Sequence, residues 1–135
     1  MFEVAHDDEG AFAFISTTIR LNRSEHQKGI VLRRDGEIIA AALYVEFTGT
    51  NIFIHLVGKP GRRWLTRDFL KWGFHYPFVQ LGCSRVSCWV EADNLASRRF
   101  VEHIGWQHEA TLKGAGHAGQ DVFIYAMFRE DCRYV

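Results

Sequence analysis

The pattern of apolar and polar segments along the chain predicts strands and helices in a mixed order. The predicted strands are Met1–Ala5, Ile30–Arg33, Glu37–Phe47, Ile52–Val57, Arg85–Glu91, Trp106–Lys113 and Asp121–Arg129. The predicted helices are Glu9–Leu21, Arg63–Tyr76 and Leu95–His103. The order β-α-β-β-β-α-β-α-β-β indicates an α/β (α+β) fold with one mixed sheet and helices on its faces.

Turn residues between these segments predict how the strands pair. Asp35-Gly36 is a two-residue hairpin signal, and Thr48 to Asn51 forms the next turn, so the strands between residues 30 and 57 should form an antiparallel meander. Glu37–Phe47 is apolar until Glu46, which indicates that both of its faces are covered.

The spacing changes after residue 57. Ile52–Val57, the helix Arg63–Tyr76 and the strand Arg85–Glu91 have the lengths of a strand–helix–strand crossover, with Pro77 bending or ending the helix. Such a crossover makes the two strands parallel neighbours. We therefore expect a mostly antiparallel sheet with one parallel pair and helices on both faces.

Composition narrows the class of protein. The 135 residues predict a single domain spanning 1–135. Sixteen basic and sixteen acidic side chains cancel, which argues against nucleic acid or an anionic membrane as a partner. No apolar run reaches the roughly 18 residues of a membrane helix, and the first ten residues do not resemble a signal peptide. The three cysteines form no CxxC and lack zinc-ligand spacing, which predicts reduced thiols, no metal and a cytoplasmic location.

Two segments carry candidate chemistry. A loop at residues 58–61 leads into the helix predicted from Arg63, where unpaired first-turn amides and the arginines Arg62, Arg63 and Arg67 suit a phosphate. The alternative is a solvated basic helix start. Asn94 is placed to cap the next helix, with Ser97 at its third position. The alternative there is a cap with no further role.

Taken in order, these segments resemble the GNAT superfamily of acetyl-CoA-dependent N-acetyltransferases from about Gly29 to the C-terminus. The most specific motif residues are Asn94-Leu95-Ala96-Ser97, Ile104-Gly105-Trp106, Glu109, Asp121 and Tyr125. The chain is most similar to the ribosomal-protein N-acetyltransferase branch and to small acetyltransferase-like proteins of tailed bacteriophages.

The resemblance implies acetyl-CoA as co-substrate, bound where Ile52–Val57 splays from Arg85–Glu91. The pantetheine arm would lie in that gap, and a backbone N–H of Leu56 or Val57 would polarise the thioester carbonyl. The resemblance places the cofactor-binding residues at Leu56, Val57, Arg62, Arg63, Trp64, Leu65, Thr66, Arg67, Asn94 and Ser97.

The chain departs from the family pattern at two places. The phosphate loop lacks its usual glycines, because those positions hold Leu65 and Arg67 in one register and Trp64 and Thr66 in the other. The bulky side chains fit only if they point into the core or over the cofactor. Val101 stands where many members carry the tyrosine that protonates the leaving thiolate.

His55 and Glu46 are the candidate bases. Each interrupts an apolar strand, and histidine is suited to proton transfer near neutral pH. The alternative for each is a partly buried polar side chain with a structural partner.

These observations leave two hypotheses. The first is an N-acetyltransferase that moves acetyl from acetyl-CoA to a primary amine (a protein N-terminus, a lysine or a small amine) by direct attack. The second is a catalytically inactive member of the fold, such as a phage-encoded one, that serves as a structural or protein-binding module. The aromatic cluster around Pro77 is a candidate homodimer interface.

Overall fold

The computed structural model describes residues 1–19, 21–23 and 26–135. The strands are β1 (Phe2–His6), β2 (Lys28–Arg34), β3 (Glu37–Val45), β4 (Phe53–Gly58), β5 (Arg85–Glu91), β6 (Gln107–Leu112) and β7 (Val122–Phe128). The helices are α1 (Asp8–Ser16), α2 (Arg67–His75) and α3 (Leu95–Ile104), with a π-turn at Tyr76–Gln80 and a short 3-10 turn at Arg129–Asp131. The predicted element order is confirmed.

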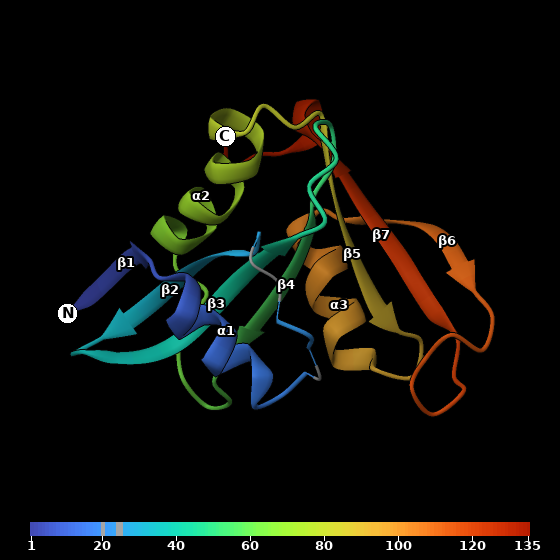
Figure 1. The fold of residues 1–135 in the computed structure, drawn as a ribbon, viewed down its shortest axis with the longest axis horizontal. Helices are drawn as coiled ribbons and strands as arrows, with labels where there is room; N and C mark the ends of the chain where they lie inside the picture. The colour runs from blue at the N-terminus through green and yellow to red at the C-terminus, as the bar shows by residue number, and fades with distance from the viewer. Residues whose placement is uncertain (20, 24–25) are drawn as a thin grey trace.

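The seven strands form one sheet in the order β1-β2-β3-β4-β5-β7-β6. Neighbouring strands are antiparallel except β4 and β5, which are parallel, as the crossover predicted. Edge strands β1 and β6 lie at opposite ends of the molecule, and β4 and β5 diverge toward their carboxyl ends (Figure 1). The predicted mixed sheet is therefore confirmed, including its single parallel pair.

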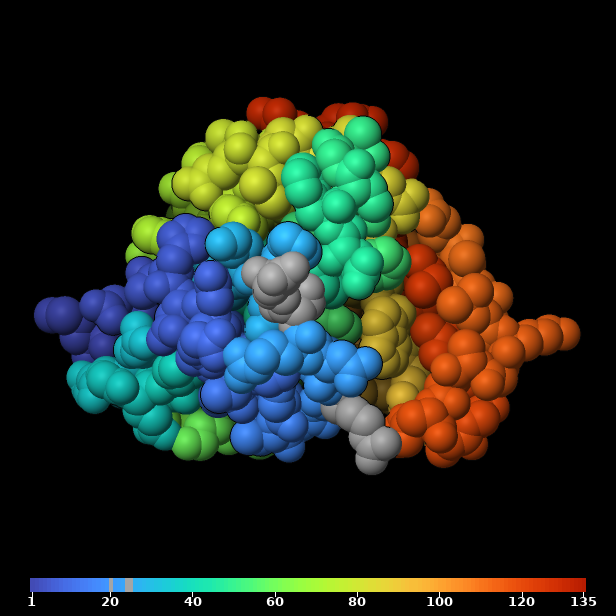
Figure 2. Space-filling view, in the orientation of Figure 1, coloured from blue at the N-terminus to red at the C-terminus, as the bar shows by residue number. Residues whose placement is uncertain are grey.

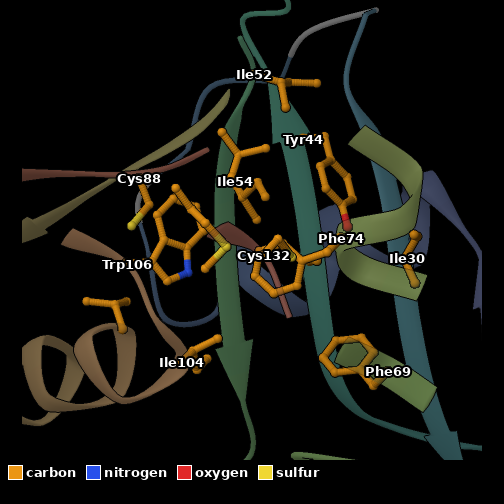
Figure 3. Close-up of a cluster of buried hydrophobic side chains, with 14 of the residues drawn as sticks. Ile30, Tyr44, Ile52, Ile54, Phe69, Phe74, Cys88, Ile104, Trp106 and Cys132 are labelled. Atoms are coloured by element: carbon orange, nitrogen blue, oxygen red, sulfur yellow. The ribbon is translucent and has the colours of Figure 1, made fainter. Parts of the chain in front are cut away.

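Helices cover both faces of this sheet. On one face α1 buries Ala11 and Ile15 against Val31, Ala41 and Leu43. On the other face α2 and α3 pack over a second cluster, whose aromatic part Figure 3 shows around Phe69, Phe74 and Trp106. Strand β3 supplies side chains to both clusters, which explains why its sequence is apolar at successive positions.

Most predicted boundaries differ from the structure by one or two residues, and three differences have a clear local cause in a hydrogen bond or a backbone conformation. Helix α1 ends at Ser16, and the Thr17 hydroxyl donates to the Phe14 carbonyl (2.7 Å), which favours termination over propagation. The helix predicted over Glu9–Leu21 is thus too long, and its Arg20 lies outside the described residues. Strand β3 ends at Val45, because Glu46 adopts a left-handed conformation (φ 57°).

The third boundary concerns α2, which begins at Arg67 rather than Arg63. Thr66 is the N-cap, and its hydroxyl accepts a hydrogen bond from the Phe69 N–H at 3.1 Å. The preceding Arg63 and Trp64 are not helical. The free amides at the helix start therefore lie four residues later than predicted.

Candidate functional site

The parallel pair β4 and β5 forms a fork in the sheet. The two strands are in register only at Phe53 and Ser87, where the Ser87 N–H donates to the Ile52 carbonyl (2.9 Å). Beyond this point toward their carboxyl ends the strands separate (Figure 1). The splaying that the family resemblance implied is present.

A polar network holds the closed end of the fork. The Ser87 hydroxyl, 1% exposed, donates to Asn51 Oδ1 at 2.6 Å. Arg85 donates through Nε to the same Asn51 oxygen (3.3 Å) and through its terminal nitrogens to both carboxylate oxygens of Glu109 (2.9 and 3.0 Å). Arg85 holds the pKa of Glu109 below its usual value through this hydrogen bond. The network joins β5 and β6 to the residues that lead into β4, where divergence begins.

The strand register decides which backbone groups face the fork. The Lys59 N–H donates to the Ile39 carbonyl (2.8 Å), and hydrogen-bonded pairs alternate along an antiparallel ladder. Val57, opposite Ala41, therefore directs its N–H toward β3. Leu56, opposite Ala42, directs its N–H and C=O toward the opening between β4 and β5. Of the two oxyanion donors that the sequence offered, the geometry favours Leu56.

A cavity of about 670 Å³ occupies the fork. On the α2 and α3 side its wall is largely apolar and includes Ile54, Leu56, Phe69, Phe100, Val101 and Trp106. On the α1 side its wall is more polar and includes Thr18, His55, Trp89, Glu91 and His117. Because residues from both faces line one cavity, it passes through the sheet where β4 and β5 have separated.

Figure 2 shows the mouth of the cavity on the α1 side as a recess between the blue segment that contains α1 and the orange segment that contains the β6–β7 connection. A volume of this size is typical of a small-molecule or cofactor site. Two reactants that enter from opposite faces would meet inside the sheet.

His55 lies on the wall of this cavity, as its proposed role requires. Its ring meets Trp89 of β5 edge-on, with ring centroids 5.9 Å apart. Burial lowers the pKa of His55 below its ordinary value, because the charged form loses solvation. The ring is therefore neutral at physiological pH.

Glu46, the other candidate base, is not among the residues that line the cavity. Its side chain is exposed beyond the end of β3. The structure thus brings His55 to the fork and leaves Glu46 outside it.

Cys88 of β5 also lines the cavity, on the α3 side near Ile54 and Trp106 (Figure 3). Burial raises its pKa to about 12. The thiol therefore keeps its proton near neutral pH, and a protonated thiol is a poor nucleophile.

The loop between β4 and α2 is built around Trp64. A Cβ added at Gly58 would lie 1.9 Å from the Trp64 indole, so the ring rests directly on the Gly58 backbone. The indole also contacts Phe69 (centroids 6.3 Å apart) and Phe100 (5.2 Å). Trp64 thus points into the core, whereas Leu65 is 38% exposed. The missing side chain at Gly58, at the end of β4, leaves the space that the Trp64 indole occupies.

The three arginines around this loop have different surroundings, and none of them lines the 670 Å³ cavity. Arg62 donates to Glu37 at 3.1 Å, and Lys59 pairs with the same carboxylate. Lys59 and Arg62 together lower the pKa of Glu37. Arg67 lines a separate cavity of about 310 Å³ beside β1. Arg63 is exposed and makes no ion pair within the described residues.

The first turn of α3 borders the cavity through Asn94 and Ser97. Asn94 Oδ1 accepts a hydrogen bond from the Ser97 N–H at 3.2 Å, which confirms the predicted cap. The capping role and the position on the cavity wall are compatible, because the Ser97 hydroxyl and the Asn94 amide nitrogen are not used by the cap.

Two residues of the α1-side wall were missed by sequence reasoning. His117 Nδ1 lies 2.6 Å from Glu91 Oε1, although the residues are 26 positions apart. The sequence around His117 is a glycine-rich turn with no periodicity, which gives no signal for this pairing.

Within the described residues, no group of three His, Cys, Asp or Glu side chains could hold a metal ion. No helix among these residues is long and apolar enough to cross a membrane.

The forked sheet, with helices on both faces and one parallel pair, defines a GNAT-like fold. No family model matches the sequence, and no curated protein matches it. Solved structures do match. A variant of spermidine N-acetyltransferase SpeG from Vibrio cholerae superposes with a TM-score of 0.81 at 13% identity, over 98% of this chain and 97% of that one. Mutant forms of the spermidine/spermine N-acetyltransferase SpeG from Vibrio cholerae give 0.78 at 12% identity, over 96% of each chain. At these identities the likeness shows the fold alone.

The described residues fit the acyl-pantetheine part of acetyl-CoA better than its phosphates. The apolar wall between α2 and α3 and the free backbone of Leu56 suit an extended arm that carries amides. At the phosphate end, Arg62 is engaged by Glu37, Arg63 does not line this cavity, and the first residues of α2 line the separate cavity beside β1. The cavity therefore fits the acyl-carrying arm, and the phosphate end differs from the expected loop.

Proposed function

We propose that the protein is an acetyl-CoA-dependent N-acetyltransferase that moves the acetyl group to a primary amine by direct attack. The observation that carries this proposal is the cavity that passes through the sheet at the fork, with the Leu56 backbone directed into it. The similarity in fold to spermidine N-acetyltransferases supports the same reaction class.

Each wall of the cavity has a role in this reaction. Bound acetyl-CoA supplies an activated thioester. The Leu56 N–H is placed to hold the carbonyl oxygen as negative charge develops on it. Asn94 and Ser97 hold the arm at the start of α3, and the apolar side chains of α2 and α3 exclude water. The amine approaches from the α1 side, where the polar side chains of the wall lie.

Direct attack is favoured over a covalent acyl-enzyme. Cys88 is the thiol on the cavity wall, and its raised pKa, about 12, keeps it protonated. A two-step route through this sulfur would need a thiolate, and the described wall provides no cation beside Cys88 to stabilise one. The acceptor amine therefore attacks the thioester itself.

An amine panel tests the proposal. The protein is incubated with acetyl-CoA and, separately, spermidine, a peptide with a free N-terminus, and an N-blocked peptide that contains lysine. We expect amine-dependent release of CoA thiol with at least one acceptor, an acetylated product by mass spectrometry, and no mass increase of the protein. Spermidine is the first acceptor to try, because the matched structures are named for it.

The alternative is an inactive module that keeps the fold, and the engagement of Arg62 by Glu37 favours it. If no acceptor raises the rate of CoA thiol release above the rate measured without amine, this alternative is supported. Acetylation of the protein itself at Cys88 would contradict direct attack but not transferase activity.

A further inference from the structure

We propose that His117, oriented by Glu91, is the base that accepts the proton of the acceptor ammonium; this inference rests on the proposed acetyl transfer. Glu91 is the last residue of β5, and His117 belongs to the β6–β7 connection. Both side chains line the α1 side of the cavity, the side from which the amine approaches.

The contact between the two residues fixes the tautomer of the neutral imidazole. Glu91 Oε1 lies 2.6 Å from His117 Nδ1, and an ionised carboxylate only accepts hydrogen bonds. Nδ1 therefore carries the hydrogen of the neutral ring, and Nε2 keeps a lone pair. Among the described residues, Nε2 has no hydrogen-bond partner. The nitrogen that can take a proton is thus available to a ligand.

The surrounding turn holds this pair in place. Gln120 Nε2 donates to the other Glu91 oxygen at 2.7 Å, and Gln120 Oε1 accepts from the Ala118 N–H at 2.8 Å. The Gly116 N–H also donates to the Gln120 carbonyl at 2.7 Å. A Cβ at Gly116 would lie 2.5 Å from Gln120 Oε1, so a larger residue there would displace the Gln120 side chain from these contacts. The Glu91 carboxylate is therefore satisfied on both oxygens and oriented toward His117.

His117 suits this role better than His55. His55 is desolvated, which lowers its pKa, and no carboxylate contacts it within the described residues. An imidazolium at His55 would be poorly stabilised. At His117 the Glu91 carboxylate is in direct contact, and the side chain is 81% exposed. A proton taken by His117 can therefore pass on to solvent.

Proton transfer to His117 precedes formation of the carbon–nitrogen bond. The acceptor ammonium gives one proton to His117 Nε2, which makes the amine nitrogen nucleophilic. Its lone pair forms the bond to the acetyl carbonyl carbon, and the carbon–sulfur bond breaks with its electrons going to sulfur. The second nitrogen proton then passes to that sulfur, giving an amide and a thiol. His117 finally returns its proton to solvent.

Single-turnover kinetics with saturating acetyl-CoA and spermidine test the catalytic role. We expect His117→Gln, which cannot take a proton at the same position, to lower the rate roughly 10²-fold, the lower range for loss of a general base. His75→Gln is the matched control, because His75 is exposed and lies outside the cavity, and it should keep the wild-type rate. If the wild type transfers acetyl and His117→Gln does so at the same rate, the base assignment is wrong. The proposed function would then still stand.

Nitrogen-15 NMR of the histidine rings supplies a readout that does not depend on activity. In the wild-type protein His117 should show the tautomer with hydrogen on Nδ1. Glu91→Ala removes the acceptor, so this preference should be lost for His117 and unchanged for His75 and His103. An Nε2-protonated His117 in the wild type, or a spectrum unaffected by Glu91→Ala, would contradict the positioning role of Glu91. Absence of transfer by the wild type would instead overturn the proposed function and this inference with it.

Discussion

The contact between Gly58 and Trp64 shows how a single residue shapes the candidate cofactor site. The expected phosphate loop lacks glycine at the family's usual positions, and the Trp64 indole instead lies on Gly58, a residue without a side chain. Through Phe69 and Phe100 the indole then supports the apolar wall of the cavity. A change at Gly58 therefore acts on the site through packing.

We expect Gly58→Ala to lower the free energy of unfolding by about 1–3 kcal/mol, the usual cost of overpacking. The added Cβ would lie 1.9 Å from the indole. Urea denaturation measures the loss. Gly73→Ala is the control, because the nearest atom to its Cβ is the Tyr44 hydroxyl at 3.6 Å and an alanine stabilises a helix interior. Trp64→Leu in the Gly58→Ala background should restore part of the loss. A neutral Gly58→Ala variant would show that Trp64 does not pack there.

His55 gives a pH dependence whose sign follows from burial. Its pKa in the folded state is lowered from 6.5, so the unfolded chain binds the proton first as pH falls. The free energy of unfolding should therefore decline as pH drops below about 6.5, until the folded-state pKa is passed. In His55→Gln this contribution is absent, so the loss of stability between about pH 7 and pH 5 should be smaller than in the wild type. Urea titrations at both values measure it, and equal losses in the two proteins would refute the assignment.

At the scale of elements, the fork depends on the network around Asn51. Asn51 Oδ1 accepts hydrogen bonds from both Ser87 and Arg85 at the last point where β4 and β5 are paired. Removing this acceptor leaves the hydroxyl of Ser87, a residue that is 1% exposed, with no acceptor for its hydrogen, while the same oxygen still accepts from Arg85 at 3.0 Å. The strands would then be less firmly joined where they begin to separate.

Asn51→Ala should therefore cost about 1–3 kcal/mol of unfolding free energy, the penalty of an unsatisfied buried polar group. Thr50→Ala, at the exposed neighbouring side chain, should change it by less than about 0.5 kcal/mol. Hydrogen exchange gives a second measurement, in which the Ser87 amide should lose protection in Asn51→Ala only. Equal stabilities of the two variants would contradict a role for the network.

The order and pairing of the elements could be predicted from the sequence because they depend on local patterns. The Asp35-Gly36 turn defines one hairpin, and the spacing from Ile52 to Glu91 implies the parallel pair. Helix ends were less predictable. The start of α2 depends on the Thr66 cap and on Trp64 reaching Gly58, and apolar periodicity does not report either contact.

The candidate site was predictable only where one segment defines it. Asn94 and Ser97 sit in a capping pattern, and His55 interrupts an apolar strand. The surroundings of Arg62 depend on Glu37, 25 residues earlier, and those of His117 depend on Glu91, 26 residues earlier. Contacts between distant segments leave no trace in composition or periodicity, so these pairs required the structure.

At the scale of the whole molecule, the two faces of the sheet have different chemistry at one cavity. The α2 and α3 side is apolar and suits an extended acyl-carrying arm, whereas the α1 side presents His55, Glu91 and His117. The fork between β4 and β5 connects the two sides. A reaction between two molecules that approach from opposite faces is what this arrangement supports best.

Calorimetric titration with acetyl-CoA tests this account most directly, using the wild type and two tryptophan variants of α3. Ser97 lines the cavity, so Ser97→Trp should fill part of it, whereas Arg99 is exposed on the same helix and outside the cavity. We expect one molecule of acetyl-CoA to bind per wild-type chain, Arg99→Trp to bind equally well, and Ser97→Trp to bind at least roughly tenfold more weakly, a loss of about 1.4 kcal/mol. No binding by the wild type, or equal binding by Ser97→Trp, would contradict the assignment of the cavity to acetyl-CoA.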